Sequence, residues 1–173
     1  MQAASQSSNH LLQFPYLIQI KIPMKILKQN PYFFLTIALS FVTDQVTKYL
    51  AFNFLSTPII LTQWFNFRYE QNFGIAWSIQ IPYFLLIFLN IILIIGIVWF
   101  TFARAKHSLK IVQVILGTLI GGALGNLFDR LFRGFVIDFI SIGTFPVFNL
   151  ADSFITISIF CIVLFYDTIA RKP

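Results

Sequence analysis

Residues 81–103 read IPYFLLIFLNIILIIGIVWFTFA and contain no charged side chain. A helix needs about 20 mostly apolar residues to cross the hydrocarbon core of a bilayer. The apolar residues of this segment form a continuous run and do not alternate with polar ones, as they would in a half-buried strand. We therefore expect residues 81–103 to form a transmembrane helix, and this expectation decides the fold class.

The composition of the whole chain also favours a membrane protein. Of its 173 residues, 58% are hydrophobic and only 10% are charged, and the mean hydropathy is +0.81. Soluble domains are normally about a quarter charged. A soluble chain with so few charges would expose large apolar surfaces, which soluble monomers rarely do. The single cysteine, Cys161, cannot form an intramolecular disulfide or a zinc cluster.

Three further apolar segments, residues 31–52, 111–127 and 147–166, complete a set of about four predicted transmembrane helices. The first contains Asp44 and Lys48 and is the least apolar of the four. The basic residues lie in small groups at the ends of these segments, which argues against a nucleic-acid partner despite the net charge of +6.

The basic residues also predict an orientation. With four spans, eight of them share one side: Lys21, Lys25, Lys28, Arg104, Lys106, Lys110, Arg171 and Lys172. The opposite side has only Arg68, Arg130 and Arg133. By the positive-inside rule, both termini are expected in the cytoplasm, with residues 53–80 and 131–147 on the outer face.

The predicted outer segments and the N-terminus complete the expected architecture. Aromatic and polar residues alternate from Phe65 to Glu70, which is strand periodicity and predicts a small amphipathic sheet at the membrane surface. Residues 131–147 are expected to form an extended loop beside it. Residues 1–23 are interpreted as a dispensable or disordered extension, because Met24 precedes a complete basic flank and span. Residues 24–173 then form a single membrane-embedded domain.

Four of the six acidic residues, Asp44, Asp129, Asp138 and Asp152, lie within or at the ends of apolar segments. Carboxylates at such depth are costly and usually line a protein interior or a watery cavity. Asp44 and Lys48 lie one helical turn apart, which favours a structural ion pair over a catalytic role.

Residues 117–130 combine small and polar side chains. Gly117, Gly121 and Gly125 repeat every fourth residue and predict close packing against a neighbouring helix. Asn126, Asp129 and Arg130 fall on one face at the outer end of the same helix. These three polar residues fit either a terminal hydrogen-bond cluster or part of a functional site.

The segment that opens the last span allows two interpretations. Asn149 is placed to cap the helix, and Asp152, three residues later, would complement the helix dipole. Asp138 has no comparable local explanation, because it lies in an apolar segment without a polar neighbour. The chain returns from the third span to the fourth through this segment, which can bring Asp138 close to Asp152.

Two nearby carboxylates cannot both ionise readily, so one of them keeps a proton. The ionised carboxylate can then deprotonate a water molecule, while the protonated one polarises a peptide carbonyl and supplies the leaving amine. No metal is expected, since the sequence has no HExxH motif or cysteine cluster. His10 and His107 fall on the predicted cytoplasmic side, which argues against a Ser-His-Asp triad. Asn72 and Gly74 indicate a turn or a substrate-facing amide.

Five segments, in order, resemble the signature blocks of one family, the lipoprotein signal peptidases (signal peptidase II). The blocks are Thr43 to Lys48, Asn72 to Trp77, Gly121 to Arg130, Val136 to Phe139, and Phe148 to Asp152. The resemblance implies an aspartic endopeptidase of the bacterial inner membrane that removes signal peptides from diacylglyceryl-modified prolipoproteins. The family's enzymes cut just before the lipidated cysteine.

The same resemblance implies roles for individual residues. Asp138 and Asp152 match the catalytic pair, and four positions match polar residues that line the substrate site: Asn72, Asn126, Arg130 and Asn149. Asp129 matches a supporting position beside the site, where a neighbouring Arg130 is expected to keep it ionised. We expect a monomer in contact with membrane lipid, without a cofactor. A small membrane transporter or a structural membrane subunit is the alternative.

Overall fold

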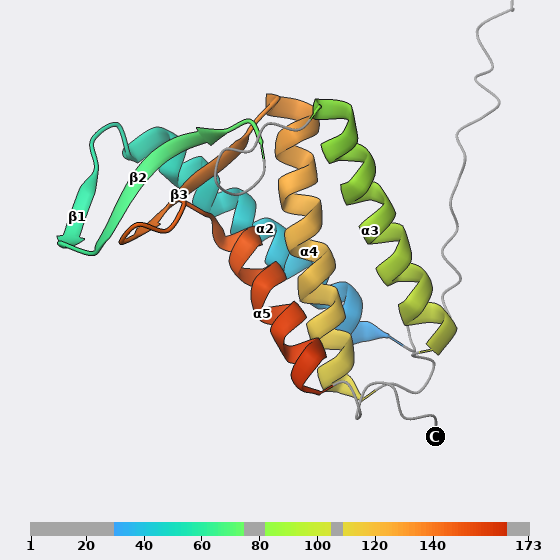
Figure 1. Cartoon of the computed structure of the whole chain (residues 1–173). Helices are drawn as coiled ribbons and strands as arrows, with labels where there is room; N and C mark the ends of the chain where they lie inside the picture. The colour runs from blue at the N-terminus through green and yellow to red at the C-terminus, as the bar shows by residue number, and fades with distance from the viewer. Residues whose placement is uncertain (1–29, 75–81, 105–108, 166–173) are drawn as a thin grey trace, which may run out of the picture.

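The computed structural model describes residues 30–74, 82–104 and 109–165, and shows a helical bundle with a small sheet at one end (Figure 1). The helices are α2 (Pro31–Phe54), α3 (Tyr83–Arg104), α4 (Lys110–Arg133) and α5 (Leu150–Leu164). The strands are β1 (Ile59–Thr62), β2 (Phe65–Asn72) and β3 (Val136–Ile142). The expectations for residues 1–23, for both termini and for Ile75 to Trp77 concern parts of the chain outside the described residues.

Each of the four predicted spans forms a helix, but the bounds of each helix differ from those predicted. α4 continues to Arg133 and ends at Gly134, whose φ of 83° is left-handed and suits glycine. α5 begins three residues later than expected, because Phe148 pairs with β3. By length and apolar composition, two described helices are able to cross a membrane, in Tyr83–Thr101 and Lys110–Arg133. α2 and the shorter α5 do not meet the same criterion.

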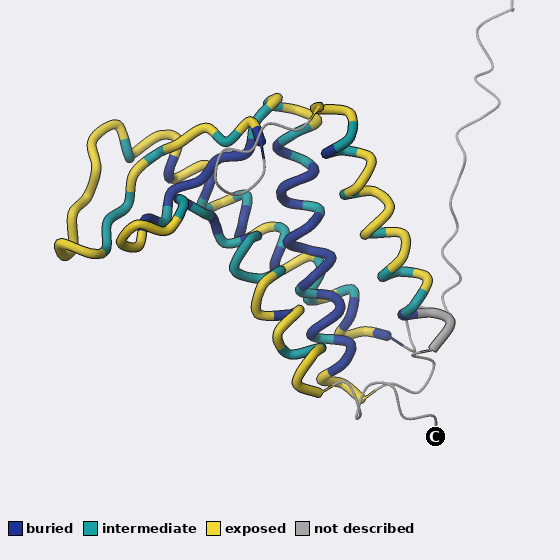
Figure 2. Tube along the Cα trace, viewed as in Figure 1, coloured by how far each residue is buried: buried dark blue, intermediate teal, exposed yellow. Residues whose placement is uncertain are grey.

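α4 is the central helix and packs against α2, α3 and α5. It is the most buried helix of the bundle, whereas α3 is largely exposed (Figure 2). The predicted glycine face of α4 turns toward α2: a Cβ on Gly121 would lie 2.7 Å from the carbonyl oxygen of Ile37. Gly122 brings α4 equally close to Ala151 of α5. These close approaches bring polar residues of α2, α4 and α5 near one another.

The three strands form an antiparallel sheet in the order β1-β2-β3. The strand predicted from the alternation in residues 65–70 is confirmed as β2. The extended loop expected for residues 131–147 is wrong in part, because its middle forms β3. β3 lies between β2 and the helices, and Ile137 and Phe139 pack with Ala51 of α2 in a buried apolar cluster.

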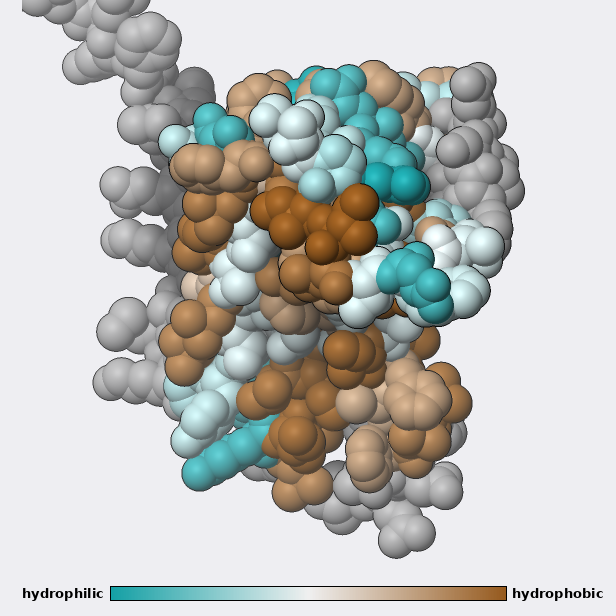
Figure 3. All heavy atoms as spheres, turned by 90° about the vertical axis from the view of Figure 1, so that its left-hand side faces the viewer, coloured by the Kyte–Doolittle hydropathy of each residue, from teal (hydrophilic) through white to brown (hydrophobic). Residues whose placement is uncertain are grey.

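The two ends of the bundle differ. The starts of α2 and α4 and the ends of α3 and α5 lie together, and the sheet lies beyond the other end (Figure 1). Large apolar side chains such as Phe84, Ile95 and Trp99 are exposed along α3. On the face shown in Figure 3, apolar side chains cover much of the helical part, and polar side chains gather mainly near the sheet. The outer surface of the helices therefore suits lipid.

Candidate active site

Asp138 lies on β3 and is only 2% exposed. Asn72 of β2 donates its Nδ2 hydrogen to Asp138 Oδ2 at 2.9 Å, and Asn149 donates to Asp138 Oδ1 at 2.6 Å. Asn72 also makes the predicted turn, since its Oδ1 accepts from the backbone nitrogen of Gly74 at 2.9 Å. Both carboxylate oxygens of Asp138 are therefore fixed by amides.

Asp152 occupies the third position of α5 and takes part in a capping box. Asn149 Oδ1 accepts from the Asp152 backbone nitrogen at 2.9 Å, and Asp152 Oδ2 accepts from the Asn149 backbone nitrogen at 3.2 Å. The capping interpretation is confirmed. The capping box uses only Oδ2 of Asp152. The other carboxylate oxygen, Oδ1, accepts from Asn126 Nδ2 of α4 at 2.8 Å.

A chain of amides joins the two carboxylates. Asn149 Nδ2 donates to Asp138 Oδ1 at 2.6 Å and to Asn126 Oδ1 at 3.2 Å, and Asn126 in turn donates to Asp152. Burial first, and then the charge of Asp152, raise the pKa of Asp138 to about 7, against the opposing effect of its amide hydrogen bonds. Near neutral pH, Asp138 is thus able to hold a proton.

The backbone between β3 and α5 explains why residues 138 and 152 meet. Ile140 and Phe148 pair as an antiparallel bridge, with the Ile140 nitrogen donating to the Phe148 oxygen at 2.8 Å and the return bond at 3.0 Å. This bridge closes the intervening residues into a loop, and α5 begins two residues after Phe148, beside β3. Asn149, the next residue, is therefore delivered directly to Asp138.

A pocket of about 590 Å³ opens beside these groups. Its amide and charged side chains are those of Asn72, Asn126, Arg130 and Asp152. Its other lining residues are mainly apolar: Gly74, Val136, Phe145, Pro146, Val147, Phe148, Ser153, Ile155, Thr156 and Ile157. The pocket therefore combines a few hydrogen-bonding groups with mainly apolar walls, which is the usual composition of a site for an organic ligand.

Arg130 faces this pocket. Its Nη1 donates to the Asn126 carbonyl oxygen at 3.4 Å and its Nη2 to the Gly74 carbonyl oxygen at 3.3 Å. The Arg130 carbonyl oxygen in turn accepts from the hydroxyl of Tyr83, at the start of α3. Arg130 thus connects α4 to the turn after β2, and Tyr83 connects α3 to α4. The sequence did not indicate this role of Tyr83.

Arg130, which was expected to keep Asp129 ionised, interacts with it only through its charge, and the ion-pair partners of Asp129 are other residues. Asp129 is fully buried and forms ion pairs with Lys48, at 3.0 Å, and with Arg133. Adjacent helical residues point in different directions, whereas residues four apart share a face. Gln45 also donates to Asp129 Oδ1, at 3.2 Å. Asp129 therefore belongs to a cluster behind the pocket and is not among the residues that line it.

The predicted ion pair between Asp44 and Lys48 is confirmed, at 2.8 Å, with neither side chain exposed. Sequence reasoning missed two members of the same cluster, Gln45 and Arg133, whose side chains meet at 3.0 Å. The available signal was the four-residue spacing between Asp129 and Arg133. Within the described residues, no group of His, Cys, Asp and Glu side chains is arranged to hold a metal ion.

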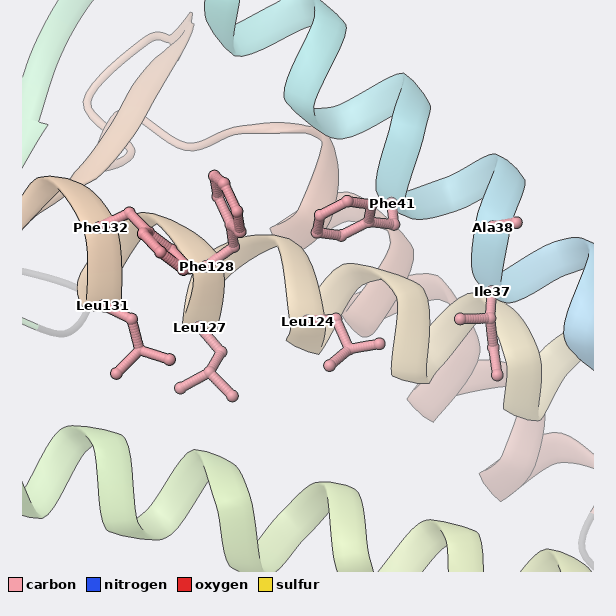
Figure 4. A pocket seen from close by; sticks show the side chains of 8 residues that line it. All are labelled: Ile37, Ala38, Phe41, Leu124, Leu127, Phe128, Leu131 and Phe132. Carbon is pink, nitrogen blue, oxygen red and sulfur yellow. The ribbon is translucent and has the colours of Figure 1, made fainter. Parts of the chain in front are cut away.

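A second pocket, of about 340 Å³, lies between α2 and α4 and has only apolar side chains (Figure 4). Phe41 of α2 meets Phe128 of α4 edge to face, with ring centroids 5.7 Å apart. Leu127 and Leu131 project from α4 toward α3 (Figure 4). With no titratable group in its lining, this pocket has nothing to contribute to acid–base chemistry.

The fold and the first pocket define a helical bundle with a buried carboxylate site at its sheet-bearing end. The family described as signal peptidase (SPase) II matches residues 36–168. The chain belongs to this family.

Individual relatives agree with the family match. The chain is 33% identical over 157 residues to a lipoprotein signal peptidase of Chlorobaculum tepidum, covering 81% of this chain and 96% of the relative. It is 39% identical over 129 residues to one of Caldicellulosiruptor bescii, covering 72% and 83%. A solved structure described as a bacterial membrane enzyme superposes with a TM-score of 0.69 at 32% identity, covering 88% of this chain and 93% of that one.

Proposed function

We propose that this protein is an aspartic endopeptidase that removes signal peptides from diacylglyceryl-modified prolipoproteins and cuts before the lipidated cysteine. The family supports a peptidase of lipoprotein precursors. The observation that carries the aspartic assignment is the pair of carboxylates, Asp138 and Asp152, which are joined through Asn149 and Asn126. Asp152 lines the pocket, and Asp138 is buried beside it.

The two carboxylates have different environments and therefore different proposed roles. Asp152 lines the pocket and is partly exposed, so its remaining lone pairs can take a proton from water. Asp138 is buried, and its pKa of about 7 allows it to keep a proton at neutral pH. When different environments separate the pKa values of two paired carboxyl groups, the group with the lower pKa acts as the base and the other as the acid.

The proposed reaction proceeds by attack of water. Asp152 takes a proton from the water molecule while the water oxygen bonds to the peptide carbonyl carbon. The proton on Asp138 polarises the carbonyl oxygen. When the tetrahedral intermediate collapses, the carbon–nitrogen bond breaks and the leaving amine takes up a proton from the pair. Asn72, Asn126, Asn149 and Arg130 hold the carboxylates and the pocket wall in place.

The pocket walls support a lipid-bearing substrate. Phe145, Phe148, Ile155 and Ile157 contribute large apolar side chains to the pocket lining. We place the sheet-bearing end at the outer face of the bacterial inner membrane, with α2, α3, α4 and α5 as spans and both termini in the cytoplasm. The basic residues at the ends of the apolar segments support this orientation. A monomer surrounded by membrane lipid completes the proposal.

The test is cleavage by the purified full chain in detergent. A fluorogenic peptide that spans the cleavage site and carries a diacylglyceryl-modified cysteine should be cut immediately before that cysteine. The same peptide with an unmodified cysteine is the control and should remain intact. Absence of cleavage of the lipidated peptide would refute the proposed function, and solute flux in proteoliposomes would then favour a transporter.

A further inference from the structure

Lys48 is a buried ammonium group behind the pocket whose hydrogen-bonding capacity is fully used. Its Nζ lies 2.8 Å from Asp44 Oδ2, 3.0 Å from Asp129 Oδ2 and 2.9 Å from Asn126 Oδ1, and the side chain is 0% exposed. An ammonium has three N–H donors and no acceptor. All three donors are therefore directed at defined atoms, two on carboxylates and one on an amide.

The two carboxylates that Lys48 holds each bind the backbone next to a member of the proposed catalytic pair. Asp44 Oδ1 accepts from the nitrogen of Ala151, at 3.0 Å, and Ala151 precedes Asp152. Asp129 Oδ2 accepts from the nitrogen of Ile137, at 3.2 Å, and Ile137 precedes Asp138. One ammonium thus connects, through Asp44 and Asp129, the start of α5 and the start of β3.

The third donor of Lys48 determines how Asn126 is oriented. Asn126 Oδ1 accepts from Lys48 and from Asn149, so its Nδ2 is left to donate to Asp152 at 2.8 Å. With the amide reversed, Oδ1 would face the Asp152 carboxylate, and two acceptors cannot form a hydrogen bond. A cation beside Oδ1 strongly favours the observed orientation.

We propose that Lys48 is a positioning residue for peptide cleavage, which fixes the separation of Asp138 and Asp152 and orients Asn126 toward Asp152. This inference rests on the proposed function. The competing explanation is that Lys48 only balances charge, since Asp44 and Asp129 are matched by Lys48 and Arg133. Arg133 pairs with Asp129 but, within the described residues, forms no ion pair or hydrogen bond with Asn126, so it separates the two explanations.

The decisive variant is the double substitution Lys48→Met with Asp44→Asn. It removes one charge of each sign, so Asp129 keeps Arg133 as its partner and no buried carboxylate is left unpaired. Asn at position 44 can still accept from the nitrogen of Ala151. The control is Arg133→Met, which removes a cation from the same cluster without touching Asn126. All variants are compared with wild type at equal amounts of folded, monodisperse protein.

The double variant should lose kcat by on the order of 100-fold, as expected when catalytic groups are displaced by about 1 Å. Arg133→Met should stay within about threefold of wild type, because this ion pair is partly exposed. The charge of Lys48 lowers the pKa of Asp138, so this pKa should rise in the double variant. The alkaline limb of the pH profile of kcat should therefore move to higher pH. The other charged groups that act on Asp138 are Asp152 and Arg130. Glu70, the partner of Asp138 on β2, is exposed and paired with Arg68 at 2.8 Å.

Two results would overturn the positioning role: a double variant with wild-type kcat and an unshifted limb, or an equal loss of kcat in Arg133→Met. A purely structural role would lower the yield of folded protein but leave kcat per folded molecule unchanged. If wild type itself does not cut the lipidated peptide, the proposed function fails, which is a separate outcome.

Discussion

Close packing of α4 on α2 predicts that one methyl group at Gly121 will destabilise the bundle. A Cβ at this position would lie 2.7 Å from the Ile37 carbonyl oxygen and 2.7 Å from Ser40 Cβ, whereas ordinary contact begins at 3.4 Å. The first neighbour is backbone and cannot rotate away. Gly96 on α3 is the matched control, because a Cβ there meets nothing within 4 Å.

The magnitude follows from comparing the two substitutions. Gly→Ala improves helix propensity by up to about 1 kcal/mol at either site, so this contribution cancels between Gly121→Ala and Gly96→Ala. Overpacking in a close-packed interior costs about 1–3 kcal/mol. The free energy of unfolding of Gly121→Ala should therefore be lower than that of Gly96→Ala by this amount, measured by denaturant unfolding in mixed micelles. Equal stability of the two variants would refute the packing of α2 against α4.

Three further predictions concern the reaction, the topology and the N-terminus. Cleavage should decline as the pH rises above about 7, because Asp138 then loses the proton that the reaction requires; a kcat that stays constant to pH 9 would contradict this protonation state. Reporter fusions at Lys110 and at Gly143 should report opposite sides of the membrane, and the same side for both would exclude four spans. Deletion of residues 1–23 should leave insertion and cleavage intact, as tested by membrane fractionation and the peptide assay; a truncated chain that no longer inserts would show that the extension is needed.

The helices were predictable because apolar length and glycine spacing are local signals. Four apolar segments gave four helices, and the glycine repeat correctly indicated a closely packed face. The end of α4 was not predictable from hydropathy. Asp129 and Arg133 would be expected to end an apolar helix, but Lys48 and Gln45 satisfy them within the bundle, and the helix continues to Gly134.

The strand that carries Asp138 could not be recognised by periodicity. One face of β2 is more exposed than the other, and the resulting alternation of aromatic and polar residues identified the strand. β3 is buried on both faces, and the residues on both sides of Asp138 are apolar. The partners of Asp138 were equally hidden, since Asn72 and Asn149 lie 66 and 11 residues away in the sequence. The resemblance to the family placed these residues near the site, and only the fold showed how they connect.

The central claim is that Asp138 and Asp152 act together, and the most direct measurement is kcat for Asp138→Asn and Asp152→Asn with the diacylglyceryl-modified peptide. Each change keeps the shape of the side chain but removes the carboxylate, so both variants should accumulate in the membrane and lose nearly all cleavage. Glu70→Gln, on the strand paired with Asp138, is the matched control and should cleave normally. Cleavage at the wild-type rate by Asp138→Asn would contradict the account.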